Sequence, residues 1–492
     1  MESICKRLIV VILCLFCFGG LHSQIKDTSE IIYKDSIFVT RPKPINAAAE
    51  VVGYNVGLWT FNRYAMNVEY AHINLQTMKS NLQHSFVWDN DYFSTNYFLH
   101  PYQGGLYFNT ARSNGLSFGA SMFYSLGGSL TWEYLMENEP PSFNDIITTP
   151  ISGVLIGEVM FKMSNRVIDS RAVGWERFGR ELLGFVINPV NGFNRIISGN
   201  AWKRSNYSGK MIADSPTDFS ITSGYRGLYA NNVGSIDNSA YIGLHLLYGD
   251  AFSDENEKPY DNFTFSATLN ILGNQPILAD MNILGEIWGE NISLKNDKMD
   301  LHWGVFQHFY YYESESPKDN LKTSMYRFAE AASFGLGGRF RADISDKTNF
   351  ETGAYINGIV LGSNTTDYYN LYHRDYNYGS GFSTKLNASL VFNERTSFEA
   401  GIENYQMYSW KGYALDTDFS QLTDEEQFEF DVQGDESSTN FMVTKLKFNH
   451  WFSNNVLFSI GTSSYKRQSN YRFFENKRSN VTDYQIGLGY TF

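Results

Sequence analysis

The last nine residues of the chain, Tyr484-Gln485-Ile486-Gly487-Leu488-Gly489-Tyr490-Thr491-Phe492, alternate between large apolar side chains and small or polar ones. In a β-strand this alternation places the two kinds of side chain on opposite faces. A soluble sandwich would turn the large side chains into a core, whereas a membrane barrel turns them toward lipid and keeps the small ones for a crowded lumen. The terminal stretch therefore favours a strand of a membrane barrel.

The same period of two runs through the chain after Trp202. We predict about twelve strands, at residues 216–228, 239–249, 261–271, 281–292, 299–312, 326–344, 348–362, 380–392, 396–412, 438–452, 456–467 and 481–492. A sheet that faces hydrocarbon must close, because an open edge would leave backbone groups without hydrogen-bond partners. Residues 212–492 are therefore predicted to form an outer-membrane β-barrel of about 12 antiparallel strands.

The connections between the predicted strands give an orientation. Short turns such as 345–347 and 453–455 follow even-numbered strands, and long loops such as 363–379 and 413–437 follow odd-numbered ones. Short turns lie on the periplasmic side of bacterial barrels and long loops outside the cell. We expect outer-membrane lipids, including lipopolysaccharide, around the barrel. The final Phe492 is similar to the terminal signal that the barrel-assembly machinery reads, so that machinery is a further expected partner.

Composition excludes one class of partner. The chain is 16% aromatic with 41 glycines, which is typical of strands that are apolar on only one face, and its formal net charge is -13. Nucleic-acid binding needs a basic stripe, so no nucleic-acid partner is expected.

The N-terminus has the features of a secretory signal at residues 1–23. Lys6 and Arg7 precede an apolar run, and small residues precede Gln24. All three cysteines lie within this segment, so we expect no disulfide, thiolate metal site or cofactor in the mature chain. Residues 24–44 are polar and predict a periplasmic lead-in.

Residues 45–205 change to a helical period and predict an all-α N-terminal domain. One helix is expected near 115–137, a second with Thr149 as its N-cap and Pro150 at its first position, and a third at 172–186. The mature chain contains no apolar run of about 18 residues, so no obvious membrane helix is expected. We place this domain in the periplasm or in the inner mouth of the barrel.

Several short motifs within this domain are distinctive in combination. They include Trp88-Asp89-Asn90-Asp91, His100-Pro101-Tyr102-Gln103-Gly104, Trp132-Glu133-Tyr134 and Pro141-Ser142-Phe143-Asn144-Asp145. Together they resemble the domain of unknown function 3943, a family found in Bacteroidota and some other bacteria. The resemblance covers about a third of the chain. It implies no activity, because the family is uncharacterised.

A cluster of polar residues lies in the apolar surroundings of the helical segment: His100, Arg112, Glu133, Asn144, Asp145 and Glu158. An imidazole beside a carboxylate can do acid–base work, so the candidate catalytic groups are His100 with Glu133 or Asp145, in a hydrolase acting on lipid A or phospholipid. Buried polar groups more often cap helices or satisfy one another. Ser142 and Asp145 have the spacing of a capping box, and Glu158 has Lys162 at i+4.

Two further patterns have ordinary explanations. Asp89 and Asp91 begin with the spacing of a calcium loop, but Phe93 stands where an oxygen ligand is required. Helix capping or loop hydration is the better interpretation. Gly153 and Gly157 lie four residues apart, which permits close contact between helices.

The inward faces of the predicted strands carry five acidic and five basic side chains: Glu286, Glu290, Glu351, Glu399, Glu403, Arg339, Arg341, Lys385, Lys445 and Lys447. Because the acidic and basic side chains are equal in number, we expect them to form ion pairs with one another in a filled lumen rather than to line an ion-selective pore. Five tyrosines between 368 and 378 crowd one external loop, where they suit stacking on sugar rings or the interfacial girdle.

These observations favour a non-enzymatic outer-membrane barrel that acts in envelope transport, lipid handling or assembly, with an envelope protein partner that the sequence does not identify. The alternatives are the lipid hydrolase built on His100 and a passive diffusion channel.

Overall fold

The structure is a computed structural model that describes residues 41–231, 234–254, 256, 258–315, 324–423, 426–427 and 430–492. The predicted signal at 1–23 and most of the predicted lead-in at 24–44 lie outside the described residues.

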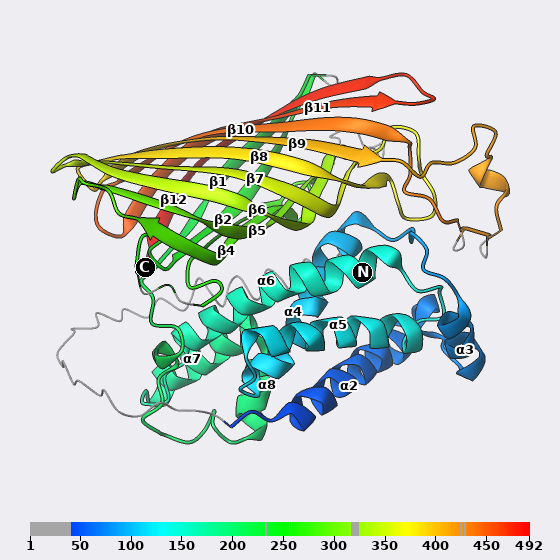
Figure 1. The fold of residues 1–492 in the computed structure, drawn as a ribbon, viewed down its shortest axis with the longest axis horizontal. Coiled ribbons are helices and arrows are strands. Elements are labelled where there is room, and N and C mark those ends of the chain that lie inside the picture. The colour runs from blue at the N-terminus through cyan, green and yellow to red at the C-terminus, as the bar shows by residue number, and fades with distance from the viewer. Residues whose placement is uncertain are drawn as a thin grey trace.

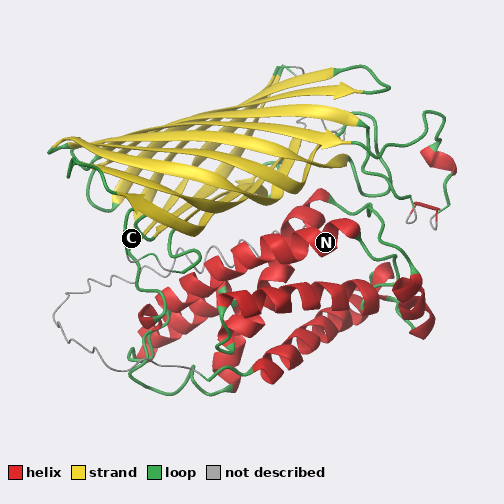
Figure 2. Ribbon diagram, viewed as in Figure 1, coloured by secondary structure: helices red, strands yellow, loops and turns green. Residues whose placement is uncertain are grey.

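Twelve antiparallel strands form a closed barrel in which each strand pairs with its neighbours in sequence and β1 pairs with β12 (Figure 1, Figure 2). The strands are β1 Thr217–Ala230, β2 Ser235–Tyr248, β3 Phe263–Leu272, β4 Leu278–Ile292, β5 Met299–Glu315, β6 Ser324–Ser345, β7 Thr348–Thr365, β8 Tyr376–Phe392, β9 Thr396–Ser409, β10 Ser437–Trp451, β11 Val456–Tyr471 and β12 Lys477–Thr491. The predicted membrane β-barrel is confirmed, because period-2 patterning and the need to close the sheet together determine this architecture.

Strand pairing separates the two faces of the wall. Ile486 lies opposite Tyr225 and both side chains are exposed, whereas the next pair, Gln485 and Arg226, belongs to the lumen face. The same register continues without a shift through β11, β10 and β9. Leu488 is 60% exposed on this face, so the large side chains point away from the lumen, as the terminal strand predicts.

A bulge in β4 corrects one predicted lumen residue. The pairing with β5 slips between Glu286 and Trp288, so one residue is unpaired and the alternation of faces inverts beyond it. Glu286 stays inside against His302, but Glu290 pairs with the outward Trp303 and is exposed outside. A strict period of two applied across the bulge gave the wrong face for Glu290.

The N-terminal domain is all helical. Its α-helices are α2 Pro44–Thr60, α3 Leu75–Gln83, α4 His100–Ser113, α5 Phe118–Leu135, α6 Phe143–Val167, α7 Gly174–Ile187 and α8 Pro189–Ile197. The π-helical turns η1 Phe61–Met66 and η3 Thr95–Leu99 extend α2 and precede α4. The predicted helices near 115–137 and 172–186 correspond to α5 and α7.

The helix expected to begin at Pro150 begins seven residues earlier. The Ser142 hydroxyl caps α6 by accepting a hydrogen bond from the Asp145 backbone N–H at 3.3 Å, and Pro150 lies inside the helix. The capping residues, rather than the proline, set the start of this helix. Within the described chain, α6 is the helix whose length and apolar composition suffice to cross a membrane, and most of it is buried.

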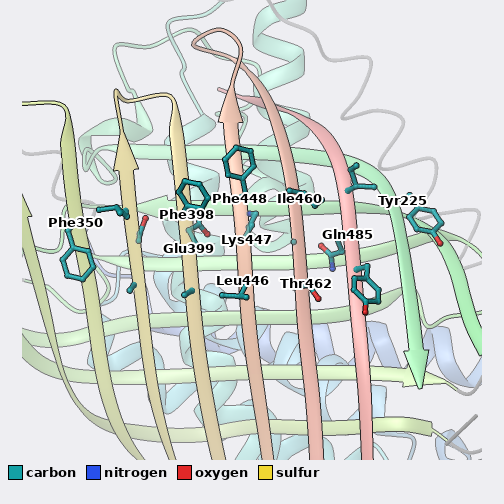
Figure 3. A pocket seen from close by; sticks show the side chains of 17 residues that line it. Tyr225, Phe350, Phe398, Glu399, Leu446, Lys447, Phe448, Ile460, Thr462 and Gln485 are labelled. Carbon is teal, nitrogen blue, oxygen red and sulfur yellow. The ribbon is translucent and has the colours of Figure 1, made fainter. Parts of the chain in front are cut away.

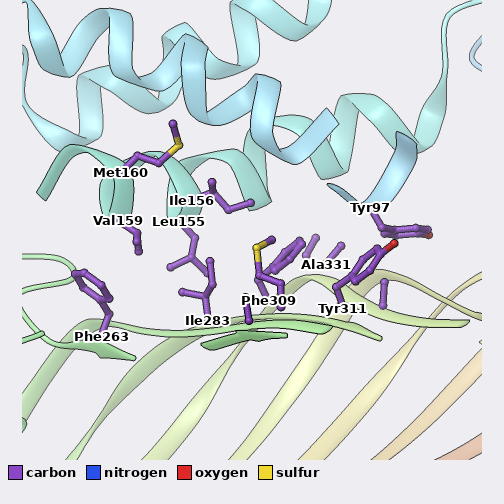
Figure 4. Packing of buried hydrophobic residues seen from close by; sticks show 14 of the residues in the cluster. Tyr97, Leu155, Ile156, Val159, Met160, Phe263, Ile283, Phe309, Tyr311 and Ala331 are labelled. Carbon is purple, nitrogen blue, oxygen red and sulfur yellow. The ribbon is translucent and has the colours of Figure 1, made fainter. Parts of the chain in front are cut away.

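The helical domain lies beside the barrel, along its outer wall (Figure 1). Buried side chains of α6 share one hydrophobic cluster with outward-facing side chains of β2 to β8 (Figure 4). The sequence predicts the domain in the periplasm or in the inner mouth of the barrel. The structure packs it against the outer side of the wall rather than in the mouth, and the periplasmic location stays a prediction. The reason is that this part of the wall is apolar and α6 presents a complementary apolar face.

Candidate functional site

Helix α6 runs along the barrel wall from the end that has the long loops, which we call the loop end, to the end that has the short turns, which we call the turn end. The Gln307 amide of β5 donates to the Ile151 carbonyl at 2.8 Å, and the Ser152 hydroxyl donates to the Ala331 carbonyl of β6 at 3.0 Å. Near its C-terminus, Lys162 forms an ion pair with Asp261 in the β2–β3 connection at 2.6 Å. Polar contacts to buried backbone groups fix the position of the helix along the wall.

Between these contacts the interface is apolar. Leu155, Ile156, Val159 and Met160 of α6 pack against a set that includes Phe263, Ile283 and Phe309 of the wall. Small residues allow the close approach. A Cβ on Gly285 of β4 would lie 2.8 Å from the Leu155 side chain.

Asp89 is the centre of a hydrogen-bond network at the loop end of this interface. Its carboxylate accepts from the Ser142 hydroxyl at 2.8 Å and from the amides of Asn96 and Asn144, both at 2.7 Å. It also accepts from the Tyr378 hydroxyl of β8 at 2.7 Å. Donors from the start of α6, from η3 and from the barrel therefore meet at one carboxylate.

The network holds Asp89 in its ionised form. Burial alone would raise the pKa of this carboxyl, but hydrogen bonds from Asp145, Asn144, Tyr378 and Ser142 lower the pKa to about 2. Hydrogen bonds to a charged group are roughly twice as strong as neutral ones. Asp89 is therefore a strong attachment point between the helices and the wall.

Other carboxyl groups next to Asp89 have the opposite shift. Burial, and then the charge of Asp89, raises the pKa of Asp91 well above its usual value. Burial, and then Glu137, raises the pKa of Glu139 to about 8. In the described part of the chain, no group of three or more His, Cys, Asp or Glu side chains is placed to hold a metal ion.

External loops complete the junction. The Tyr369 hydroxyl donates to the Asn90 side chain at 2.6 Å, and the His373 backbone N–H donates to the Asn90 carbonyl at 3.2 Å. The Trp88 backbone N–H donates to Asp431 in the β9–β10 loop at 3.2 Å. We call residues 88–96, Ser142, Asn144, Tyr376 and Tyr378 the Asp89 junction.

The polar cluster predicted from the sequence separates into distinct groups. Arg112 and Glu158 form a two-pronged ion pair between α4 and α6, at 2.8 and 2.9 Å. Glu133 accepts from the Ser142 backbone N–H at 2.7 Å. Asn144 joins the Asp89 junction, and Lys162 pairs with Asp261 rather than with Glu158.

The candidate catalytic group His100 is buried. Its Nε2 lies 3.6 Å from Asp145 Oδ2, which is too long for a hydrogen bond, and its side chain is only 10% exposed. The Glu133 carboxyl is also buried and accepts from the Ser142 backbone N–H at the start of α6. The buried Asp145 carboxyl accepts from the Asn144 amide at 3.0 Å. The arrangement supports helix capping and packing better than acid–base chemistry on a substrate.

The lumen is closed by aromatic rings at its loop end. We call this set the aromatic layer: Tyr312, Tyr326, Phe328, Tyr405, Phe441 and Tyr465, each at most 4% exposed. The ring centroids of Tyr326 and Tyr465 lie 4.4 Å apart, and those of Phe328 and Phe441 lie 4.7 Å apart. Beside the layer, Arg226 and Asp483 form a buried ion pair at 2.8 Å. Packed side chains therefore occupy the lumen at this level.

Below the aromatic layer, most of the predicted charged side chains of the lumen form ion pairs or hydrogen bonds with other residues. Lys445 pairs with Glu403 at 2.8 Å, Lys385 pairs with Glu330, and Arg341 pairs with Asp300 at 2.9 Å and Asp250 at 3.3 Å. The other inward members also have polar neighbours. Arg339 donates to the Tyr355 hydroxyl, and Glu399 accepts from the Asn449 amide. Glu351 lies near Arg341, and Lys447 lies opposite Glu399 in the strand register.

Sequence reasoning missed the roles of several residues. The sequence predicts sugar stacking or a place in the interfacial girdle for Tyr376 and Tyr378, and helix capping or loop hydration for Asp89. In the structure they meet in one network. The coincidence of an acidic motif with a tyrosine-rich loop was the available signal. Glu330 and the Arg226–Asp483 pair were also missed, since bulges and long-range pairing leave no local pattern.

The uncovered wall, on the side away from the helices, contains a shallow apolar hollow of about 750 Å³ (Figure 3). Outward-facing side chains such as Phe350, Phe398, Leu446 and Ile460 line it. The strand register places it on the surface that faces lipid, so it belongs to the membrane-contacting wall.

Fold and site together define an outer-membrane β-barrel that carries a helical domain on its outer wall. Residues 85–190, which contain most of the Asp89 junction, match the model of the family described as Domain of unknown function (DUF3943), which confirms the resemblance seen in the sequence. No curated protein matches the chain.

Solved structures similar to this chain include bacterial channels. The KdgM porin in complex with disordered oligogalacturonate is 10% identical, with a TM-score of 0.23, over 55% of this chain and 99% of that one. The anion-selective porin from Comamonas acidovorans is 7% identical, with a TM-score of 0.22, over 56% and 99%. The COG4313 outer membrane channel from Pseudomonas putida F1 is 10% identical, with a TM-score of 0.25, over 56% and 96%. At such scores the barrel class rests on the strand pairing itself.

Proposed function

We propose that this protein is a non-enzymatic scaffold of the outer membrane, whose barrel holds the helical domain in place for lipid handling or assembly in the envelope. The Asp89 junction carries this proposal. The Asp89 carboxylate joins the helices to the barrel wall. The neighbouring Trp88 and Asn90 contact two external loops. A barrel that served only as a pore would have no need of such an attachment.

The packed lumen supports a scaffold over a diffusion channel. The aromatic layer draws rings from five strands on different sides of the barrel, and paired charges occupy the space below it. A water-filled channel needs a continuous path lined by groups that bind ions or solutes weakly. Stacked rings with almost no exposed surface offer none at that level.

Conductance in planar bilayers tests this choice. We expect the purified protein to give no stable open-channel steps, and the double variant Phe441→Ala/Tyr465→Ala to conduct because it removes two rings of the layer. Phe448→Ala is the matched control, since Phe448 is on the same strand as Phe441 but faces outward. Steady open-channel steps from the unaltered protein would reject the scaffold in favour of a channel.

The hydrolase alternative is tested in cells. We expect a strain with Asp89→Ala to reproduce the changes in envelope lipids and proteins that a deletion strain shows, and a His100→Ala strain to match the parent. The opposite result, with His100→Ala protein folded and abundant but lipid composition altered as in the deletion, would favour a hydrolase. Crosslinking through the helical domain in native envelopes should identify the partner.

A further inference from the structure

The helices that face away from the barrel carry almost no charge. Helices α2 and α5 contain one charged residue each, Glu50 and Glu133. Both are satisfied inside the domain: Glu50 accepts from Asn114 at 2.7 Å and from Asn194 at 2.9 Å, and Glu133 accepts from the Ser142 backbone. The outward surfaces of the two helices therefore have no charged side chain.

Large apolar side chains occupy those surfaces instead. Ile45 of α2 is 81% exposed and Phe123 of α5 is 74% exposed, and the other exposed members are Val52, Val56, Met122 and Leu126. A surface that contacts water is usually about 25–35% charged residues, and extended apolar patches are rare on soluble proteins. This face is therefore poorly suited to water.

Charged side chains are present at both ends of the helical domain. Arg63, Glu69 and Lys79 follow α2 at the loop end. At the turn end, α7 pairs Glu176 with Arg180 and Arg177 with Glu181 along its polar side. An apolar band with charges at its two edges is the pattern of a domain that crosses a bilayer.

Helices α7 and α8 have the composition of helices that lie at a membrane surface. Trp175 and Phe178 of α7, and Phe193 and Ile197 of α8, are exposed on one side while the charged residues of α7 are paired on the other. Amphipathic helices with aromatic residues on the apolar side bury that side at the boundary between headgroups and acyl chains. Trp202, which is also exposed, lies in the segment that follows.

The dimensions of the domain match those of the barrel. The 25 residues of α6 correspond to about 37 Å at 1.5 Å per residue, and the apolar band of a membrane barrel is about 25 Å tall. Contacts of α6 extend from the Asp89 junction at the loop end to Asp261 at the turn end. The helices and the strands thus occupy the same height, side by side (Figure 1).

We propose that the helical domain lies within the outer membrane, with α6 crossing it next to the barrel and lipid acyl chains covering the outward face of α2 and α5. The lipid-facing wall continues into the domain: strand β6 carries the exposed Leu336 and also Ala331, which is buried under α6. A bilayer that contacts Leu336 therefore meets the helices at the edge of the same strand.

Single cysteines test this placement. In a chain whose Cys5, Cys14 and Cys17 are replaced by serine, Phe123→Cys and Val52→Cys probe the proposed lipid face. Ile486→Cys on the uncovered barrel wall is the lipid control, and Lys79→Cys on the exposed surface of α3 is the water control. Protein folded into phosphatidylcholine vesicles is treated with a charged maleimide. A second sample, labelled with a fluorophore before folding, measures quenching by lipids brominated on their acyl chains.

We expect cysteines 123 and 52 to react at least about tenfold more slowly than cysteine 79, because the reactive thiolate needs water. We also expect acyl-chain bromine to quench them as strongly as cysteine 486. Fast reaction with the maleimide would place the face in water and reject the proposal. Slow reaction without quenching would show that protein, either a second copy or another partner, covers the face, and would also reject it. Leu126→Cys repeats the measurement if Phe123→Cys does not fold, and none of these outcomes depends on whether the lumen conducts.

Discussion

The barrel wall has two sides with the same strand alternation and different coverage. Where the helices contact β2 to β8, outward residues such as Phe309 and Ile283 are buried, with exposed fractions of 0% and 1%. On the side from β9 to β1, the equivalent residues Ile402 and Leu488 are 48% and 60% exposed. One sequence pattern therefore serves contact with protein on one side and contact with lipid on the other.

The difference lies in polar atoms and small side chains. The covered wall has the Gln307 amide, the Tyr378 hydroxyl and the close approach at Gly285, all of which need a partner of defined shape. The uncovered wall has aliphatic and aromatic side chains without such requirements. Lipid needs only an apolar surface, whereas a packed helix also needs hydrogen-bond partners and space.

The largest effect is expected at the covered wall. Asp89→Ala leaves several buried donors without an acceptor, so we expect a loss of about 3 kcal/mol or more in the free energy of unfolding. Limited proteolysis should then cleave the helical domain faster than in the unaltered protein while the barrel stays intact. Asp91→Asn is the control, because it removes a carboxyl that burial already disfavours in its charged form. Equal sensitivity of the two variants would mean that Asp89 is not the attachment point.

On the uncovered wall, a charge should be costly for a different reason. Ile402→Arg places a guanidinium against acyl chains, so we expect a loss of about 2–4 kcal/mol in barrel stability, measured by denaturant unfolding in vesicles. Leu415→Arg changes an exposed leucine in the β9–β10 loop and should alter stability little. If both variants behaved alike, the uncovered wall would not be in contact with lipid.

A third test concerns the packing inside the helical domain. A Cβ on Gly153 of α6 would lie 2.5 Å from the backbone of Gly104 in α4, so Gly153→Ala should cost about 1–3 kcal/mol in the stability of the domain. Gly127→Ala in α5 meets no atom within 4 Å and should leave stability unchanged or raise it slightly. Helical circular dichroism during thermal unfolding measures both. A tolerated Gly153→Ala would contradict the close contact of α4 and α6.

The smallest effect depends on pH. Burial raises the pKa of Glu139 to about 8 from its usual 4.5, so its ionisation removes stability as the pH rises from about 4.5 to 8. Glu139→Gln should therefore stabilise the junction by about 1–2 kcal/mol at pH 8, since part of the side chain still contacts water, and should have no effect near pH 4. Melting curves at the two pH values measure this. An equal gain in stability at pH 8 and at pH 4 would exclude the ionisation of Glu139 as the cause.

The sequence predicted the barrel well because each strand carries its own signal. Alternation from Phe263 or Tyr484 onward identifies a strand locally, and turns such as 393–395 fix the ends. The bulge that turns Glu290 outward has a weaker signal, the adjacent apolar residues Ile287 and Trp288, which a strict period of two does not accommodate. The site was harder to predict. Asp89 and Tyr378 are 289 residues apart, and only the closed barrel brings them together.

Coverage of β2 to β8 leaves the joint between the first and last strands free. Tyr225 of β1 and Ile486 of β12 meet on the exposed side of the wall, away from α6. A barrel closes when its last strand pairs with its first strand. Here that pairing lies on the side of the wall that the helices do not cover. The N-terminal domain can thus be folded against the early strands before the ring is sealed, without obstructing its closure.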